Sequence, residues 1–251
     1  MICLLCAVWI IWSRPVEQSV GLSINNDLLT LSEKLLYQVK TDEPVDSIVN
    51  ALSHYSSENL DRGLADDESR KVFWINLYNA WYQIFAIRDK KSKDAIYTDR
   101  DIPFADASLS LDDIEHGILR KYRWKYSFGY LPQFLPSNTI KRLAVTDIDF
   151  RIHFALNCGA KSCPPIAFYQ YERLNEQLEL ATQTFLQSEI TIDSMRHELR
   201  VTKIMQWFKG DFGGEMGIRK IVSQYLGEDY SHYTVKFKDY DWSDDLKNFV
   251  E

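Results

Sequence analysis

The sequence lacks several features that would assign it to a common functional class. No run of Lys and Arg is dense enough to follow a phosphate backbone, and the net charge of −7 disfavours a polyanionic partner, so we expect no binding to nucleic acid. No apolar run reaches the roughly 20 residues that a membrane-spanning helix needs. Internal repeats, low-complexity stretches and long Gly, Ser or Pro linkers are also missing, which favours one domain over residues 25–251.

What the chain does have is a globular composition rich in large rings. Apolar residues make up 45% and charged residues 26%, which is typical of a folded protein and not of a disordered one. Aromatic residues reach 14%, with seven Trp and fourteen Tyr. This content predicts a core built on large rings and is compatible with an aromatic-lined groove.

The first twelve residues are almost wholly apolar, and the run ends at Ser13-Arg14-Pro15. It is about as long as the apolar region of an export signal, although the positive charge that usually precedes that region is missing. We interpret residues 1–20 as a truncated signal or anchor segment whose true start lies upstream of Met1; the alternative is a buried N-terminal strand or helix. The first interpretation predicts a periplasmic or extracellular protein that meets a membrane only through this segment.

Helical periodicity dominates the first half of the chain, and strand patterns appear later. Helices are predicted over 28–39, 45–52, 69–87, 110–122, 174–185, 204–208 and 217–226, and strands over 140–145, 151–157, 198–203 and 234–239. Because the helices come first and do not alternate regularly with strands, we expect an α+β fold. In this fold a helical N-terminal part packs on a small, mostly antiparallel sheet.

The helix predicted over 69–87 is apolar on nearly all sides and should be buried, yet it carries three carboxamides. Asn76, Asn79 and Gln83 are spaced i, i+3 and i+7, which places them on one stripe of the helix. Buried carboxamides cost free energy unless their donors and acceptors are paired. They therefore either form an internal polar network or line the wall of a cleft, and the sequence leaves both open.

A second helix, predicted over 110–122, carries a carboxylate on its apolar face. Ser110 and Asp113 are spaced as a capping box at its start. Glu115 lies on the apolar stripe, where a carboxylate is either paired, for example with an Arg, or has a raised pKa that suits acid–base catalysis. His116 lies off the stripe and is expected to be exposed.

The segment 151–165 concentrates reactive side chains where a predicted strand runs into a Gly-bent loop that stops at Pro164-Pro165. These side chains include His153, Asn157, Cys158, Lys161 and Cys163. Such residues suit nucleophilic catalysis, metal binding or a small disulfide. The Cys-x4-Cys spacing is not the CxxC of redox enzymes or zinc ribbons, so a structural zinc site has little support, and we predict no metal and no cofactor.

The two cysteines leave a choice between a nucleophile and a clasp. Strand alternation separates His153 from Cys158, whereas Cys163 lies beyond the turn and can fold back over either face. Cys163 precedes a possible helix or turn start and is a better candidate than Cys158 for a thiolate nucleophile. His153 would be the base, and Glu115 or a carboxamide would be the orienting group. The alternative is a Cys158–Cys163 disulfide, or two buried thiols, with His153 as a core residue.

Several motifs together resemble the DUF547 family, whose function is unknown. They are Phe73-Trp74-Ile75-Asn76-Leu77-Tyr78-Asn79-Ala80, Ile114-Glu115-His116, the segment 153–165, Trp207-Phe208-Lys209-Gly210-Asp211-Phe212 and Tyr240-Asp241-Trp242. They occur in the family's order over about residues 72–242. The resemblance implies no activity, although bacterial members often look like exported proteins. Asp244-Asp245 departs from the family's tendency towards Leu-Asn, so the extreme C-terminus is expected to pack differently.

A weaker analogy links the chain to papain-like and transglutaminase-like folds, where a buried helix carries the nucleophile and a later strand carries histidine. Here Asn76 or Asn79 stands where that cysteine would be. Two functions follow from these observations. The first is a thiol-dependent hydrolase or transferase with a cleft formed by the two asparagines, Glu115, His153 and Cys163. The second is a non-catalytic module that binds a peptide or glycan, in which the cysteines only shape their loop.

Overall fold

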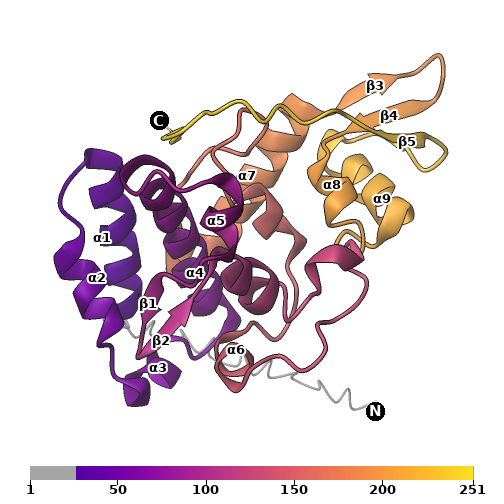
Figure 1. The fold of residues 1–251 in the computed structure, drawn as a ribbon. Coiled ribbons are helices and arrows are strands. Elements are labelled where there is room, and N and C mark those ends of the chain that lie inside the picture. The colour runs from indigo at the N-terminus through magenta and orange to yellow at the C-terminus, as the bar shows by residue number, and fades with distance from the viewer. Residues whose placement is uncertain (1–26, 251) are drawn as a thin grey trace, which may run out of the picture.

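The computed structural model describes residues 27–250 of the chain. Helices occupy its first part. They are α1 (Asp27–Thr41), α2 (Asp46–Ser53), α3 (Ser57–Gly63), α4 (Asp67–Gln83), the π-helical turn η1 (Ile84–Arg88) and α5 (Lys93–Thr98). α1 packs against α4, which lies at the centre of this half (Figure 1). The predicted helices over 28–39, 45–52 and 69–87 are therefore confirmed.

α4 is the buried axis of the molecule. Its start is fixed by a capping box, because Asp66 Oδ1 accepts the Ser69 N–H at 2.7 Å and Ser69 Oγ accepts the Asp66 N–H at 3.2 Å. From Lys71 onward every residue of the helix is buried. Phe73 and Trp74 pack on Phe104, which comes from the neighbouring hairpin. A helix that is apolar on all sides is stable only inside a core, and this one is surrounded by the other elements.

The middle of the chain supplies short elements. They are the antiparallel hairpin of β1 (Ile102–Phe104) and β2 (Ala107–Leu109), the π-helix η2 (Asp113–Leu119), and the short helices η3 (Lys125–Ser127), α6 (Asn138–Leu143) and η4 (Phe150–Phe154). The predicted capping box at the start of η2 is confirmed, since Asp113 N donates to Ser110 Oγ and Ser110 N donates to Asp113 Oδ2.

Two predicted strands are wrong. Residues 140–145 fall mainly in α6, which Ser137 caps by accepting the Ile140 N–H, and residues 151–157 begin in the 3-10 helix η4, which Asp149 caps by accepting the Arg151 N–H. A short apolar run fits a buried helix as well as a buried strand, so the caps decided the outcome. The strand alternation that separated His153 from Cys158 no longer applies, and the papain-like analogy loses its strand histidine.

The last part of the chain contains the small sheet together with several helices. Its elements are η5 (Tyr171–Arg173), α7 (Leu174–Glu189), β3 (Thr191–Asp193), β4 (Glu198–Val201), α8 (Ile204–Trp207), α9 (Gly214–Leu226) and β5 (Thr234–Phe237). β3 pairs antiparallel with β4, which pairs parallel with β5. The helices α8 and α9 lie beside this sheet (Figure 1). The α+β class is confirmed; together with the hairpin, two of the three strand pairs are antiparallel.

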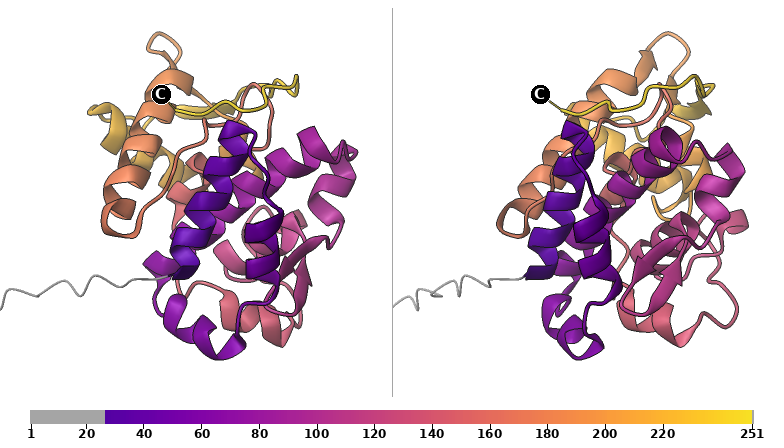
Figure 2. Two further views of the ribbon diagram at one scale, coloured as in Figure 1. Left: turned by 90° about the vertical axis from the view of Figure 1, so that its left-hand side faces the viewer. Right: turned by 60° about the vertical axis from the view of Figure 1, so that its left-hand side comes forward.

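Two hydrophobic clusters meet at η4. One contains the rings of α4 together with Ile152 and Ala155, and the other contains Phe154 with residues of α8, α9 and the sheet. The C-terminal tail then returns from β5 across to the helical half, where the views in Figures 1 and 2 place it near α1. There Lys247 Nζ pairs with Asp42, the residue that directly follows α1. Both η4 and the tail therefore connect the two halves.

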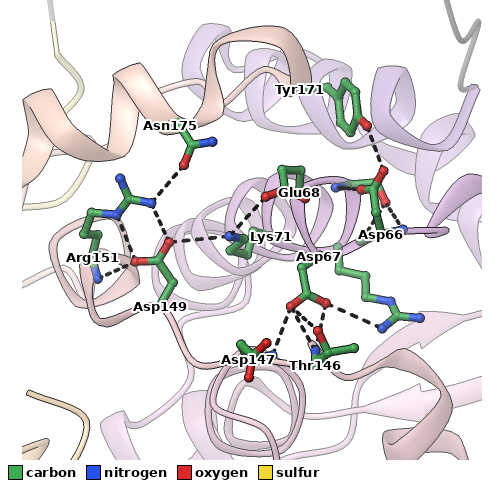
Figure 3. Close-up of polar contacts among 12 residues, drawn as sticks. Asp66, Asp67, Glu68, Lys71, Thr146, Asp147, Asp149, Arg151, Tyr171 and Asn175 are labelled. Carbon is green, nitrogen blue, oxygen red and sulfur yellow. Dashed lines mark hydrogen bonds and ion pairs between the residues drawn. The ribbon is translucent and has the colours of Figure 1, made fainter. Parts of the chain in front are cut away.

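A polar cluster holds the loop before η4 onto α4; we call it the Asp67–Asp149 cluster (Figure 3). Asp67 accepts the N–H of Thr146 at 2.8 Å, its hydroxyl at 2.7 Å and the N–H of Asp147 at 3.0 Å. Asp149 pairs with Arg151 Nη2 at 2.7 Å and with Lys71 Nζ at 3.4 Å. These contacts fix where η4 begins, and thereby where His153 lies.

None of the helices within residues 27–250 is both long and apolar enough to cross a membrane. The predicted signal or anchor segment, residues 1–20, lies outside the described residues.

Candidate functional site

A cleft of about 570 Å³ lies where η2, α5, η4, α8 and the C-terminal tail come together. Four of the predicted site residues line it: Glu115, His153, Cys158 and Cys163. Rings form much of its wall, including Tyr97, Tyr126, Trp207, Phe208, Tyr240 and Trp242. The structure thus brings together residues from distant parts of the chain in the aromatic-lined groove that the composition suggested.

Glu115 is an almost fully buried carboxyl group on η2. It is 8% exposed, and its Oε2 accepts a hydrogen bond from the Tyr78 hydroxyl of α4 at 3.0 Å. Burial raises the pKa of Glu115 to about 7, while the positive charge of Arg120 and the Tyr78 hydrogen bond act in the opposite direction. Glu115 therefore keeps its proton to a higher pH than an ordinary carboxyl group does.

His153 is held by a carboxylate and a ring. Its Nε2 lies 2.9 Å from Asp211 Oδ2, and its ring stacks on Phe208 at 4.0 Å between centroids. Burial lowers the pKa of His153 below its ordinary value, although Asp211 opposes this. Because Asp211 accepts the Nε2 proton of a neutral ring, Nδ1 is left as the basic nitrogen.

Behind His153 lies a buried ion pair. Arg120 Nε is 2.6 Å from Asp211 Oδ2, and both side chains are fully buried. Burial acts to raise the pKa of Asp211, but hydrogen bonds from His153 and Arg120 outweigh it and keep the pKa below its ordinary value. Among the described residues, Arg120 Nη2 and Asp211 Oδ1 have no hydrogen-bond partner. The pair is thus incompletely satisfied, which is uncommon for buried polar atoms.

His116 is mostly buried, so its predicted exposure is wrong. Its side chain is 16% exposed, lines the cleft, and has Nδ1 2.6 Å from Arg120 Nη1. Burial and then the Arg120 charge lower the pKa of His116 well below its ordinary value. The prediction failed because it used a 3.6-residue period, whereas η2 is π-helical, with the Arg120 N–H donating to the carbonyl of Glu115.

Cys158 and Cys163 form a disulfide with a Cα–Cα distance of 6.0 Å. This is the clasp alternative, and in this form Cys163 carries no thiolate. The role of Cys163 as a nucleophile therefore stays a prediction for the reduced protein. The Tyr240 hydroxyl lies 3.0 Å from each sulfur. Lys161 is exposed and does not line the cleft; its backbone N–H donates to the carbonyl of Ser243 in the tail.

The carboxamides of α4 lie behind the cleft, not on its wall. Asn79 donates to the carbonyl of Ala155 at 2.9 Å and accepts the Asn157 N–H at 2.9 Å. Gln83 Nε2 lies 3.4 Å from Asn157 Oδ1. The backbone on either side of Leu156, between His153 and Cys158, is therefore fastened to the buried helix.

Asn76 has the same role one turn earlier in α4, where it exchanges two hydrogen bonds with the backbone of Tyr169, at 2.8 and 3.0 Å. The prediction that Asn76 and Asn79 form the cleft is wrong. Their donors and acceptors are used by neighbouring loops, which is the internal network that the sequence left open.

Sequence reasoning missed several residues of the site. They are Tyr78, Asp112, Arg120, Trp207, Asp211, Tyr240 and Trp242. One signal existed for Asp211, a lone carboxylate in the ring-rich motif 207–212, and another for Arg120, four residues after His116. Neither signal indicated which distant residue would be its partner. Among the described residues, no three His, Cys, Asp or Glu side chains are grouped so as to hold a metal ion.

The fold and the cleft define an α+β protein whose buried ionisable residues adjoin an aromatic-lined cleft. The chain belongs to the DUF547 family: the model described as "Protein of unknown function, DUF547" matches residues 52–186, which is more than half of the chain. No curated protein and no solved structure matches it. The matched stretch contains Glu115, His153 and both cysteines of the clasp, whereas Asp211 and Tyr240 come from beyond it.

Proposed function

We propose that the cleft is the active site of a hydrolase or transferase that works by acid–base catalysis. The observation that carries the proposal is Glu115, a buried carboxyl group with a pKa of about 7 in the same cleft as His153. Burial shifts the two pKa values in opposite directions, so an unprotonated base and a protonated acid coexist near neutral pH.

In this proposal the two groups have distinct roles. His153 Nδ1 takes a proton from an attacking water or acceptor hydroxyl, while Asp211 holds the ring in the required tautomer. Glu115 gives its proton to the leaving group, and the Tyr78 hydroxyl positions its carboxyl group. In the oxidised protein the disulfide leaves neither Cys158 nor Cys163 as a free thiol, so the thiol-dependent mechanism is limited to the reduced form.

The test is a panel of chromogenic esters, peptide anilides and glycosides, with wild type compared against Glu115→Gln. We expect kcat/KM to rise below pH 6.5 as His153 loses its proton and to fall above about pH 7 as Glu115 ionises. Glu115→Gln should lower the rate by about 100- to 10,000-fold. Asp94→Asn, which alters another carboxylate that lines the cleft, is the matched control and should retain the rate.

Titration of the Glu115 carboxyl carbon by NMR tests the raised pKa of Glu115 without a substrate. A midpoint near the ordinary value of 4.5 would overturn the proposal, as would full turnover by Glu115→Gln.

A non-catalytic binding module is the second candidate, and the rings of the cleft favour it. Trp207 and Trp242 have centroids 5.4 Å apart, and Trp242 is 47% exposed, so an aromatic surface is open to a peptide side chain or a sugar ring. In this case no member of the panel is turned over. Binding of an oligosaccharide or peptide library would then be lost in Trp242→Ala and kept in Glu115→Gln.

Export remains a proposal. It is supported by the apolar start of the sequence and by the disulfide, since intramolecular disulfides persist mainly in oxidising compartments. Fractionation of the native host with an antibody to the folded domain checks it, and recovery in the cytosol contradicts it.

A further inference from the structure

The Cys158–Cys163 disulfide is unusual in its location, because both of its cysteines line the cleft. A disulfide that serves only as a clasp gains nothing from access to a cleft. Cys158 is partly exposed, whereas Cys163 is 5% exposed. A reagent that enters the cleft therefore meets the sulfur of Cys158 more readily than that of Cys163.

Two hydrogen-bond donors lie next to the buried sulfur, and one of them, the Tyr240 hydroxyl, is equally close to Cys158 Sγ. Cys163 Sγ accepts the N–H of Cys158 at 2.9 Å, and the Tyr240 hydroxyl lies 3.0 Å away. Burial raises the pKa of Tyr240, so this hydroxyl keeps its proton and remains a donor throughout the physiological range. Donors of this kind stabilise a thiolate, and a more stable thiolate leaves a disulfide faster.

The loop is held from outside as well. The N–H of Asp245 donates to the carbonyl of Gly159 at 2.8 Å, and the N–H of Asp241 donates to Ser162 Oγ at 3.0 Å. Together with the bonds from Asn79 to the backbone at Ala155 and Asn157, these contacts keep the two cysteines close when the bond between them is broken. In a CxxC motif the short spacing keeps the two thiols close to each other. Here the tertiary contacts of the loop do so.

We propose that this disulfide is a thiol–disulfide exchange site that oxidises a small dithiol bound in the cleft. A substrate thiolate attacks Cys158 Sγ, the bond between the two sulfurs breaks, and its electron pair stays on Cys163 Sγ. The second thiolate of the same substrate then attacks the substrate sulfur in the mixed disulfide and releases Cys158. The substrate loses two electrons and two protons to become a disulfide, and the protein gains two thiols. This activity uses the sulfurs and Tyr240 and does not depend on the acid–base function proposed above.

The first experiment measures how fast dithiothreitol reduces this disulfide in the full-length protein, with alkylation and peptide mapping to separate Cys158 and Cys163 from Cys3 and Cys6. We expect reduction to be at least about tenfold faster than in a synthetic peptide of residues 157–165 oxidised to the same disulfide. Tyr240→Phe removes one donor and should slow reduction by about tenfold. Tyr171→Phe removes a hydroxyl that donates to Asp66 outside the cleft, and should leave the rate unchanged.

The second experiment needs no variant. In the reduced wild-type protein, the pH dependence of Cys163 alkylation by iodoacetamide should give an apparent pKa at least one unit below the ordinary value of about 8.5. A value of 8.5 or above overturns the proposal. Reduction of the folded protein no faster than that of the peptide overturns it too, and leaves the disulfide as a clasp only.

Discussion

The Asp67–Asp149 cluster and the cleft are both polar, and both involve residues of α4, yet their electrostatics are opposite. In the cluster, burial would raise the pKa values of Asp67 and Asp149, but hydrogen bonds and nearby cations outweigh it and keep both below their ordinary values (Figure 3). In the cleft, burial prevails at Glu115 and raises its pKa to about 7.

The difference lies in how completely each carboxylate is paired. Asp67 accepts hydrogen bonds from two backbone N–H groups and a hydroxyl, and Asp149 meets both Arg151 and Lys71. Among the residues that the structure describes, Glu115 has one hydrogen-bond donor, the neutral Tyr78 hydroxyl. A fully paired carboxylate stabilises the fold, whereas a buried carboxyl group with few partners lowers stability when it ionises and is available for proton transfer.

The largest effect is expected from Asp211→Asn, which breaks the buried ion pair. Arg120 would be left as a buried charge without its carboxylate, so the free energy of unfolding should fall by about 3–5 kcal/mol. Urea denaturation at pH 7 measures this. The pKa of Glu115 should also fall, because the Asp211 charge helps to raise it. A loss below about 1 kcal/mol would show that the pair is not stabilising in this setting.

Glu115→Gln should change stability in the opposite direction. In the folded wild type Glu115 stays protonated up to about pH 7, and in the unfolded chain it ionises near 4.5, so wild-type stability decreases as the pH rises through this window. The variant avoids this loss and should be more stable than wild type by about 3 kcal/mol at pH 8, with little of that gain at pH 4. Thermal unfolding at both pH values checks the sign, and equal gains at both would contradict the raised pKa.

Asp149→Asn provides the matched substitution in the Asp67–Asp149 cluster. It removes the charge that faces Arg151 and Lys71, and should lower the free energy of unfolding by about 2 kcal/mol at pH 7. Because the pKa of Asp149 is lowered in the folded protein, the contribution is present above about pH 4 and is lost in more acidic solution. Urea denaturation at pH 7 and pH 3 should show this loss shrinking, and a loss that is the same at both would argue against the ion pairs.

The smallest effect is expected from Thr146→Val, which removes one hydroxyl donor to Asp67 and leaves the backbone donors in place. The cost should be about 0.5–1 kcal/mol, because the residue is exposed and a single hydrogen bond is lost. A cost as large as that of Asp149→Asn would mean that the hydroxyl, and not the backbone N–H groups, holds the loop.

Much of the fold could be predicted from the sequence. The long periodic helices α1, α4 and α7 and the strands β4 and β5 lie where the patterns placed them, since each carries enough repeats to define its period. The two wrong predictions concern short elements, because the few apolar residues of α6 and of η4 fit a strand as well as a helix. Ser137 and Asp149 were the caps that distinguished them.

For the candidate site, the sequence identified Glu115, His153, Cys158 and Cys163 as reactive and placed Glu115 on a buried face. It could not decide their chemistry, because this depends on residues distant in the chain. Asp211 and Arg120 determine the state of His153, Tyr78 holds Glu115, and Tyr240 contacts the disulfide. Burial and neighbours within a few ångströms set the protonation of Glu115 and His153 and the ease with which the Cys163 thiolate leaves the disulfide. Only the folding of both halves around η4 brings those neighbours together.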